Sequence, residues 1–330
     1  MAGERLGQPA TERTGVALRE PLPWHDLVQV VETAEDTGYE IVLVPEIHGG
    51  REAFATLAGF AGATSRIRLG PGVLPMSTRA PTLAAMGAAT VNEASGGRFV
   101  LGLGAGRART GAVELVREYV HQVRAALGSD VVSSSGPFPV ERFRLAIEVG
   151  PDPVPVWLAA LGPRMVELAG ELADGVLLNW CTPERVVKAR AELARGAERS
   201  GRDPAALTVA VYVRACLGPE EDHAVGALGS AAAQYAGLPS YARQLEAMGL
   251  GEQGRAAADG DPRGGEALAR SLCVWGSRHE SLERLGEWRD AGAELVVVYP
   301  VPVLEPLSSI LGTVLAAAPS PAGMDNGVEQ

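Results

Sequence analysis

Short apolar runs and longer amphipathic segments alternate along this chain. The runs are rich in Val, Leu and Ile, and the segments between them are rich in Ala, Leu, Glu and Arg. This alternation is typical of parallel strands that are joined by crossover helices. The pattern predicts strands at residues 15–19, 41–45, 67–74, 99–104, 154–159, 175–179, 207–216 and 294–299.

Helix signals fall between these strands. Leu27, Val30, Val31 and Ala34 follow the i, i+3, i+4, i+7 spacing, which predicts a helix with one apolar face to lay on a sheet.

Two further helix starts carry proline at the first helical position. Pro163 follows Gly162, and Pro183 follows Thr182, an N-cap residue, with Glu184 in the first turn. Both starts come directly after a predicted strand.

Eight strand–helix units in one chain predict an α/β fold, a (β/α)₈ TIM barrel whose chemistry lies at the C-terminal ends of its strands. We expect residues 14–317 to form this single domain. Residues 128–153 after the fourth helix and the mostly helical residues 217–274 after the seventh strand are insertions. The second insertion is expected to shape a substrate pocket or a subunit contact, or to act as a structural lid. Residues 1–13 and 318–330 lack periodicity and are expected to be disordered tails.

Composition narrows the function classes. The chain has 330 residues and a formal net charge of −11 without a basic stripe, which argues against nucleic-acid binding. No apolar run reaches the ~20 residues of a membrane span, and the N-terminus lacks a signal-peptide core. The three cysteines are far apart and are expected to be reduced thiols in a cytoplasmic protein. The five scattered histidines predict no metal site.

Glycines end the third and fourth predicted strands, at residues 70–75 and 102–106. Glycine permits unusual backbone angles and the close approach of a flat ligand or a phosphate, but it also serves tight turns between strand and helix. A dinucleotide-binding G-x-G-x-x-G motif is excluded, because Arg107 stands where the third glycine would fall.

Polar side chains follow other strands toward the same end of the predicted barrel. Glu20 follows the first strand, and Glu46 and His48 follow the second. A cleft with carboxylates and a histidine suits general acid–base chemistry. Each residue also has a structural explanation, since Glu46 could cap a turn and His48 could lie in a solvated loop.

Five stretches together resemble the bacterial luciferase-like superfamily, and within it the branch of oxidoreductases that use the deazaflavin coenzyme F420. The stretches are AEDTGYEIVLVPEIHG, RIRLGPGVLP, NEASGGRFVLGLGAG, PVPVWLAALGPRMVELAGELADGVLLNW and DAGAELVVVYP. They cover most of residues 15–300, and they particularly resemble the branch that includes methylenetetrahydromethanopterin reductase.

The resemblance implies a site for the cofactor. It implies a non-prolyl cis peptide at Gly72–Val73 that backs the deazaflavin ring, and a phosphate near the helix that begins after Thr182. The backbones and side chains implied as cofactor-binding are Gly72, Val73, Gly104, Ala105, Gly106, Ala160, Leu161, Gly162, Asn179 and Thr182.

The departures from the family are informative about the reaction. Related alcohol dehydrogenases place a histidine directly after the acid of the second strand, where this chain has Ile47, and a glutamate where it has Arg107. An alcohol-oxidising mechanism is therefore disfavoured. We predict Glu20 or Glu46 as the proton donor, with His48 and Arg107 as substrate contacts.

The resulting hypothesis is an F420-dependent reductase, acting by hydride transfer on an imine or an activated C=C bond of a small molecule. One alternative is an FMN-dependent luciferase-like monooxygenase, and another is a barrel that binds a flavin or other ligand without turnover. The resemblance also implies a homodimer.

Overall fold

Eight parallel strand positions form a barrel in the computed structural model, which describes residues 13–19, 21–106, 111–128, 130–303 and 305–319. The barrel strands are β1 (Thr14–Ala17), β2 (Ile41–Val44), β3 (Arg68–Pro71), β4 (Leu74–Pro75), β5 (Leu101–Gly104), β8 (Val156–Ala159), β9 (Gly175–Asn179), β10 (Thr208–Leu217) and β12 (Leu295–Pro300). They pair in the order β3-β2-β1-β12-β10-β9-β8-β5-β4. A parallel bridge from Leu69 in β3 to Phe99, just before β5, brings the two ends of the sheet together. The predicted TIM barrel is confirmed.

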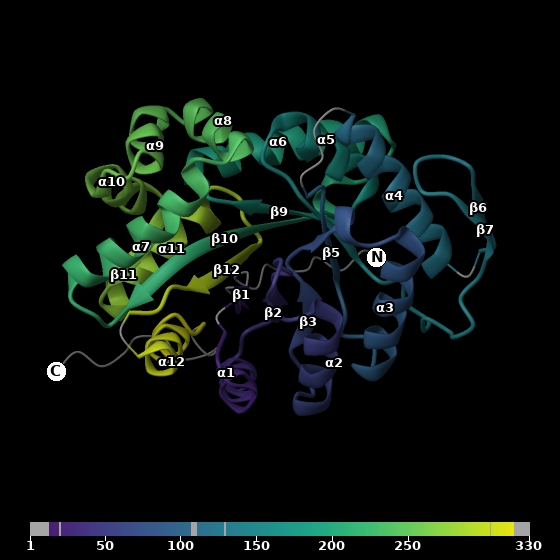
Figure 1. Ribbon diagram of the computed structural model, residues 1–330, viewed down its shortest axis with the longest axis horizontal. Coiled ribbons are helices and arrows are strands. Elements are labelled where there is room, and N and C mark those ends of the chain that lie inside the picture. Colours follow the sequence, from purple (N-terminus) through teal and green to yellow (C-terminus); the bar gives the residue numbers. More distant parts are fainter. Residues whose placement is uncertain (1–12, 20, 107–110, 129, 304, 320–330) are drawn as a thin grey trace, which may run out of the picture.

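Helices surround the barrel (Figure 1). They are α1 (Trp24–Asp36), α2 (Ala53–Ala63), α3 (Pro81–Ala94), α4 (Ala112–Leu127), α5 (Pro163–Leu172), α6 (Pro183–Arg199), α11 (Arg278–Asp290) and α12 (Pro306–Ala316). Short 3₁₀ turns occupy Met76–Thr78 and Pro204–Ala206. The apolar face predicted for the first helix is confirmed, because its four spaced positions are the buried residues of α1.

The third predicted strand is divided in two. A single strand was expected over residues 67–74, but Gly72 and Val73 interrupt it between β3 and β4. The peptide bond between them is cis, as the family resemblance implies. The two pieces keep one strand position in the barrel, since β3 pairs with β2 and β4 pairs with β5.

Both predicted insertions are present, and they lie on opposite sides of the molecule (Figure 1). The first is an antiparallel hairpin of β6 (Val132–Ser134) and β7 (Val140–Phe143). The second contains α7 (Glu221–Ala236), α8 (Pro239–Ala247), α9 (Gly251–Ala258) and α10 (Pro262–Leu272) and leads into β11 (Cys273–Gly276). Strand β11, which was not predicted, lies parallel to the distal half of β10.

The interior of the barrel is filled by large side chains. Leu43, Trp157, Tyr212, Val297 and Tyr299 belong to one buried cluster inside the ring of strands. A larger cluster lies between the strands and the surrounding helices, and a third lies within the second insertion. The barrel is thus a packed core, and room for a ligand is left at its mouth.

Within the described ranges, no helix has both the length and the apolar character needed to cross a membrane. The predicted tails fall mostly outside the described residues. Their boundaries stay predictions.

Candidate active site

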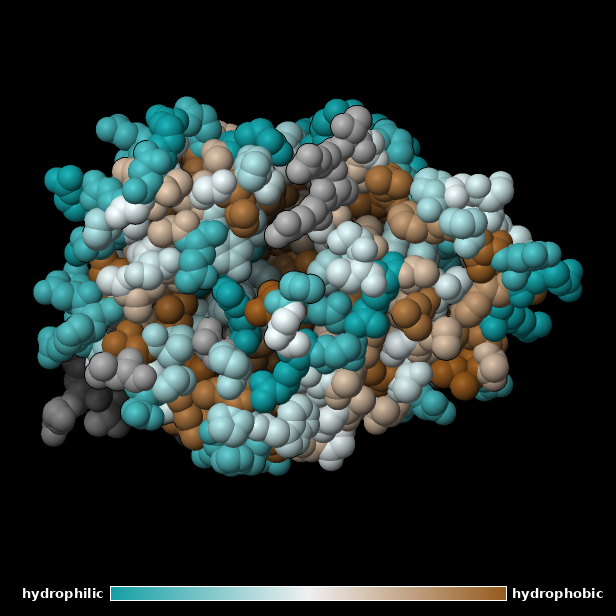
Figure 2. Space-filling model, in the orientation of Figure 1, coloured by the Kyte–Doolittle hydropathy of each residue, from teal (hydrophilic) through white to brown (hydrophobic). Residues whose placement is uncertain are grey.

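A cavity of about 890 Å³ opens at the C-terminal ends of the barrel strands. Its walls come from the segments after β1 and β2, from the ends of β10 and β12, and from helix α7 of the second insertion. Figure 2 shows hydrophilic and hydrophobic residues interspersed over the face that it draws. The position agrees with the rule that barrel chemistry lies at this end of the strands.

Arg214 is the charged residue at the centre of this mouth. It lies on β10, is 3% exposed and lines the cavity. Its Cζ atom lies 4.2 Å from the ring centroid of Trp180 and 4.3 Å from that of Tyr299, with Tyr235 at 5.5 Å and Tyr212 at 5.7 Å. A desolvated cation over an aromatic face gains about 2 kcal/mol. The four rings therefore offset part of the several kcal/mol that burial of an ion costs.

Asn179 joins Arg214 to the insertion. Its side-chain oxygen accepts a short hydrogen bond from Nη1 of Arg214, and its Nδ2 donates to the Tyr241 hydroxyl at 2.8 Å. Burial raises the pKa of Tyr241 to about 12, so this hydroxyl keeps its proton at neutral pH. Gln244 of α8 donates to the backbone oxygens of Asn179 and Trp180, at 2.8 and 2.6 Å. The end of β9 is thus fixed by helix α8.

Tyr212 fixes the Gly72–Val73 turn from across the barrel. Its hydroxyl donates to the Gly72 carbonyl oxygen at 2.6 Å. Burial raises the pKa of Tyr212 well above its ordinary value, which keeps the hydroxyl a donor. The Gly72 amide donates to Val44 O at 2.9 Å, and the Glu46 amide donates to Val73 O at 3.3 Å. The turn is held by three bonds from two directions.

The glycines of strands β3 and β5 have a structural explanation of their own. A Cβ on Gly72 would lie 1.9 Å from the Tyr212 hydroxyl, and one on Gly104 would lie 2.5 Å from the Val73 side chain. One on Gly102 would lie 2.1 Å from the Pro71 oxygen. Packing inside the barrel therefore gives these glycines a structural reason of their own. Their predicted contact with a cofactor ring stays a prediction.

Gly106 and Ala105 follow β5 at the mouth. Gly106 has φ +63°, a conformation that favours glycine, and a Cβ there would lie 2.6 Å from Ser77 Oγ. Ala105 is half-buried against the main core. Their predicted contact with a cofactor stays a prediction.

Glu46 faces a neighbouring arginine. Its carboxylate accepts a bond from Arg79 Nη2 at 2.9 Å and one from the Ala53 amide at 3.1 Å, at the start of α2. The Thr78 hydroxyl lies 3.4 Å away. Glu46 does not line the cavity. The turn-capping interpretation fits these contacts better than proton delivery.

His48 is exposed and lines the cavity. The described part of the chain contains two predicted catalytic residues, Glu46 and His48, and of these two His48 can contact a ligand in the cavity. Glu20 and Arg107 lie outside the described residues.

Two helices begin at this end of the barrel without a side-chain cap. Gly162 precedes α5 and Thr182 precedes α6, and neither helix has a capping side-chain bond. The Thr182 hydroxyl bonds Glu184 instead, which lowers the pKa of that carboxyl. No atom lies within 4 Å of the Cβ direction of Gly162. Open N–H groups at helix starts are anion-binding positions.

The remaining predicted residues lie beside these helices. Ala160 is buried and its amide donates to Leu177 O at 3.2 Å, while Leu161 O accepts a bond from Arg185 Nη2 at 3.2 Å. The mouth therefore has two halves. The cavity lies mainly beside β2, β1, β12 and β10, and the predicted cofactor residues lie between β3 and β4 and at or after the ends of β5, β8 and β9. The two halves meet at Trp180, which follows β9 and lines the cavity.

Sequence reasoning missed the aromatic residues and the arginine of β10. Arg214 is a charged residue within the apolar run VAVYVRACL. A charge at an inward position of a buried strand is an available signal, because such residues are rarely buried without a partner. Tyr212 lies two residues before Arg214 on the same strand, but Trp180, Tyr235 and Tyr299 come from other segments, and no sequence spacing connects those three rings with Arg214.

In the portion of the chain that the structure describes, no group of three or more His, Cys, Asp and Glu side chains is placed to hold a metal ion. Cys181, Cys216 and Cys273 are free and buried.

Comparisons with known proteins agree with the fold. The sequence model of the family described as luciferase-like monooxygenase matches residues 5–295. A 5,10-methylenetetrahydromethanopterin reductase from Methanolobus tindarius is 30% identical over 298 residues, which cover 82% of this chain and 89% of the relative.

Two solved structures share the fold. The coenzyme F420 dependent tetrahydromethanopterin reductase from Methanopyrus kandleri matches with a TM-score of 0.79 at 23% identity, covering 94% of this chain and 98% of that one. An F420-dependent secondary alcohol dehydrogenase in complex with an F420-acetone adduct matches with a TM-score of 0.77 at 18% identity, covering 93% and 99%.

Proposed function

The chain belongs to the family of luciferase-like monooxygenases, and on that premise we propose that it is an oxidoreductase that uses the deazaflavin coenzyme F420. The similarity to a methylenetetrahydromethanopterin reductase over 82% of the chain carries this proposal. The reaction is a reduction of an imine or an activated C=C bond in a small molecule. When bound, the reduced deazaflavin supplies the hydride.

The uncapped helices fit the anionic tail of such a cofactor. Neither Gly162 at the start of α5 nor Thr182 at the start of α6 caps its helix with a side-chain bond. The backbone N–H of Glu184 in α6 is bonded by its own carboxylate, so α5 is the more open of the two helix starts. A helix N-terminus favours an anion through these groups and through its dipole. In this proposal, Ala160, Leu161 and the backbone after β5 contact the cofactor between these helices and the Gly72–Val73 turn.

The residues of the other half then serve the substrate. Orientation in the cavity and exclusion of water by Trp180 and Tyr299 are the chain's contribution to the rate. His48, an exposed imidazole on the cavity wall, is a candidate to give a proton to the reduced product. Glu20 stays a second candidate donor, Glu46 a third, and Arg107 a candidate substrate contact.

A titration tests the cofactor assignment. Purified protein is titrated with F420 and with FMN while tryptophan fluorescence is followed, in the wild type and in Gly162→Glu. We expect F420 to bind the wild type and the added carboxylate to weaken it at least tenfold, by repulsion of the anionic tail. Gly286→Glu is the matched control, because Gly286 also has no atom within 4 Å of its Cβ direction and lies on α11.

Equal F420 affinity in wild type and Gly162→Glu would exclude the tail from this helix start. The family description favours one second candidate, an FMN-dependent monooxygenase. Tight FMN binding with oxygen consumption would establish it. Binding of F420 with no hydride transfer to imine, enone or carbonyl acceptors would favour a non-catalytic binding protein.

We also propose a cytoplasmic homodimer. The free, buried cysteines suit a reducing compartment. Leu83 and Met86 lie three residues apart on α3 and are 47% and 46% exposed, so they form part of an apolar face that a second copy could cover. Sedimentation of the wild type and of Met86→Lys tests the interface.

A further inference from the structure

The cavity is cationic in an acidic protein. Arg19, Arg51, Arg214 and His48 line it, and none of the described residues in its wall is an aspartate or glutamate. The whole chain carries a formal charge of −11. Carboxylates are thus plentiful in the chain, and the described wall of the cavity has none. A pocket of one charge sign concentrates ligands of the opposite sign.

Arg214 has no carboxylate partner among the residues that the structure describes. Two other arginines with little exposed side-chain surface are paired, Arg79 with Glu46 and Arg185 with Glu192, each within 3 Å. Arg98, of intermediate burial, instead donates to backbone oxygens such as Ser95 O and Ile67 O. Arg214 makes no ion pair within the described ranges, and its hydrogen bonding to protein there uses Nη1 on the neutral amide of Asn179. Nε and Nη2 are not among the fully buried atoms without partners, so they keep access to the cavity.

Other parts of the cavity wall are apolar. Leu27, Val44, Phe60 and Val301 contribute aliphatic and aromatic surface, and Tyr235 adds a ring from the insertion. Small-molecule sites commonly combine such surface with a few placed polar groups. A ligand that matches both parts carries one anionic head and an apolar body.

We propose that Arg214 is the anchor for an anionic group of the substrate, a carboxylate or a phosphate, and that the cavity takes an amphipathic anion. The free side of the guanidinium offers two parallel N–H donors that match such a group. The aromatic rings hold the guanidinium in place for it. This assignment rests on the proposed function only in calling the anion a substrate, because the binding itself requires no cofactor.

Calorimetry with a charged probe and its neutral isostere tests the anchor. The probes are 2-naphthoate and 2-naphthalenemethanol, and the protein is the full chain without cofactor. We expect naphthoate to bind once per chain and at least tenfold more tightly than the alcohol, as a charge-assisted hydrogen bond implies. Arg214→Gln should remove this preference, and Arg214→Lys should keep part of it.

Controls separate the anchor from general charge and folding effects. Arg270→Gln is matched, because Arg270 also lies over a tryptophan, at 5.7 Å from Trp275, but outside the cavity and paired with Glu221. It should bind both probes as the wild type does. If Arg214→Gln does not fold, the wild type and Arg214→Lys still test the preference.

Three outcomes would overturn the proposal. In the first, wild type binds naphthoate and the alcohol equally. In the second, Glu20→Gln raises naphthoate affinity tenfold or more, which would identify that carboxylate as the partner of Arg214. In the third, F420 displaces naphthoate competitively, which would assign the anion subsite to the cofactor. If F420 does not bind at all, the proposed function fails while the naphthoate preference is measured independently.

Discussion

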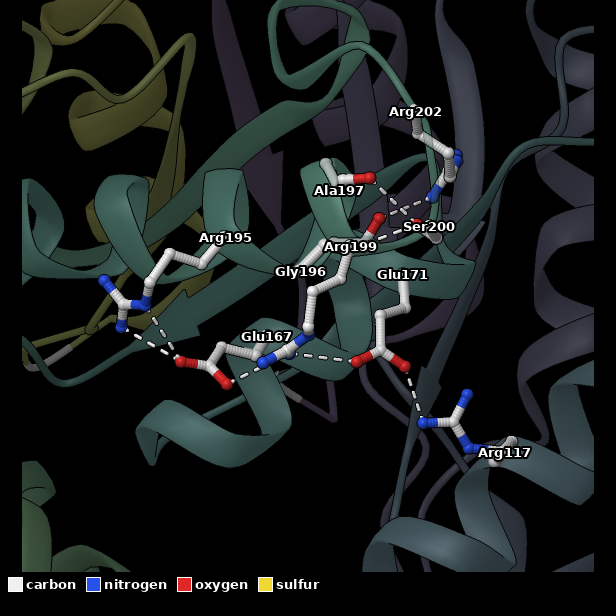
Figure 3. Close-up of polar contacts among 10 residues, drawn as sticks. Arg117, Glu167, Glu171, Arg195, Gly196, Ala197, Arg199, Ser200 and Arg202 are labelled. Atoms are coloured by element: carbon white, nitrogen blue, oxygen red, sulfur yellow. Dashed lines mark hydrogen bonds and ion pairs between the residues drawn. The ribbon is translucent and has the colours of Figure 1, made fainter.

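Arginines on the outside of the barrel pair with carboxylates, whereas the described contacts of the buried arginine at its mouth are with aromatic rings and an amide. On the outside, Glu167 of α5 pairs with Arg195 and Arg199 of α6, at 3.0 and 3.1 Å, and Glu171 pairs with Arg199 and Arg117 (Figure 3). These arginines are 40–55% exposed at the side chain. At the mouth, Arg214 is 3% exposed. Among the described residues, aromatic rings and the amide of Asn179 surround its guanidinium, and no carboxylate does.

Exposed ion pairs and a buried arginine without a carboxylate differ in what they contribute to the free energy of unfolding. An exposed ion pair contributes at most about 1 kcal/mol, because water screens it and its side chains lose freedom. A buried charge without a counter-ion costs several kcal/mol. The exterior pairs therefore add a little stability to the packing of α4, α5 and α6. The buried charge of Arg214 lowers stability, and in our proposal an anionic ligand compensates it.

Tyr212→Phe should cause the largest loss of unfolding free energy among the substitutions that we propose. Removal of the hydroxyl leaves the buried Gly72 carbonyl without its donor, which should cost about 2 kcal/mol of unfolding free energy in a urea titration. The same change should weaken F420 binding, because the turn at Gly72–Val73 loses its brace.

Tyr39→Phe is the matched control. The Tyr39 hydroxyl donates to Val314 O at 2.7 Å and is equally buried, between α1 and α12. It should lose similar stability with unchanged F420 affinity. Equal losses of affinity in both variants would show that the Tyr212 bond acts only through global stability.

Gln234→Glu adds a carboxylate to the cavity that Arg214 lines. Gln234 lies on α7 and lines the cavity, so the new carboxylate should compete with an anionic ligand. At a separation of roughly 8 Å and an effective dielectric of 20, the repulsion is about 2 kcal/mol before screening at this exposed position. We expect naphthoate affinity to fall about five- to thirtyfold in calorimetry. Gln234→Met, which removes the amide without adding charge, should bind normally; a loss there would point to a direct contact of the amide.

Strand and helix positions could be predicted because they depend on local patterns. The run at residues 175–179 matches β9 at both ends, and the four spaced apolar residues of the first helix are the buried ones. The strand β11 was missed because CVWG follows directly from a helix and pairs only with the extended end of β10. The division of the third strand was accessible only through the family resemblance.

The site was predicted in part. The cavity lies at the C-terminal ends of the strands, where the site was expected, and His48 lies on its wall. The assignment of glycines to ring access stays a prediction. The sequence did not reveal their packing role, since the Cβ directions of Gly72 and Gly104 are filled by Tyr212 and Val73, which are distant in the sequence. The aromatic surroundings of Arg214 come from β9, β10, β12 and α7, and only the folded barrel brings them together.

Glu167→Gln should have the smallest effect, and it should depend on pH. Hydrogen bonds from Arg199 and Arg195 hold the pKa of Glu167 below its ordinary value. Such a carboxylate contributes stability above the ordinary glutamate pKa of about 4.3, and the contribution is lost as the pH falls through the folded-state value. Because both arginines are about half exposed, the wild type should exceed the variant by less than about 1 kcal/mol at pH 7 in urea titrations. The two proteins should converge once the pH falls below the folded-state pKa of Glu167, and 1 M salt should reduce the difference at pH 7. A difference that stayed unchanged down to the lowest pH at which both proteins are folded would mean that Glu167 acts through packing and not through its charge.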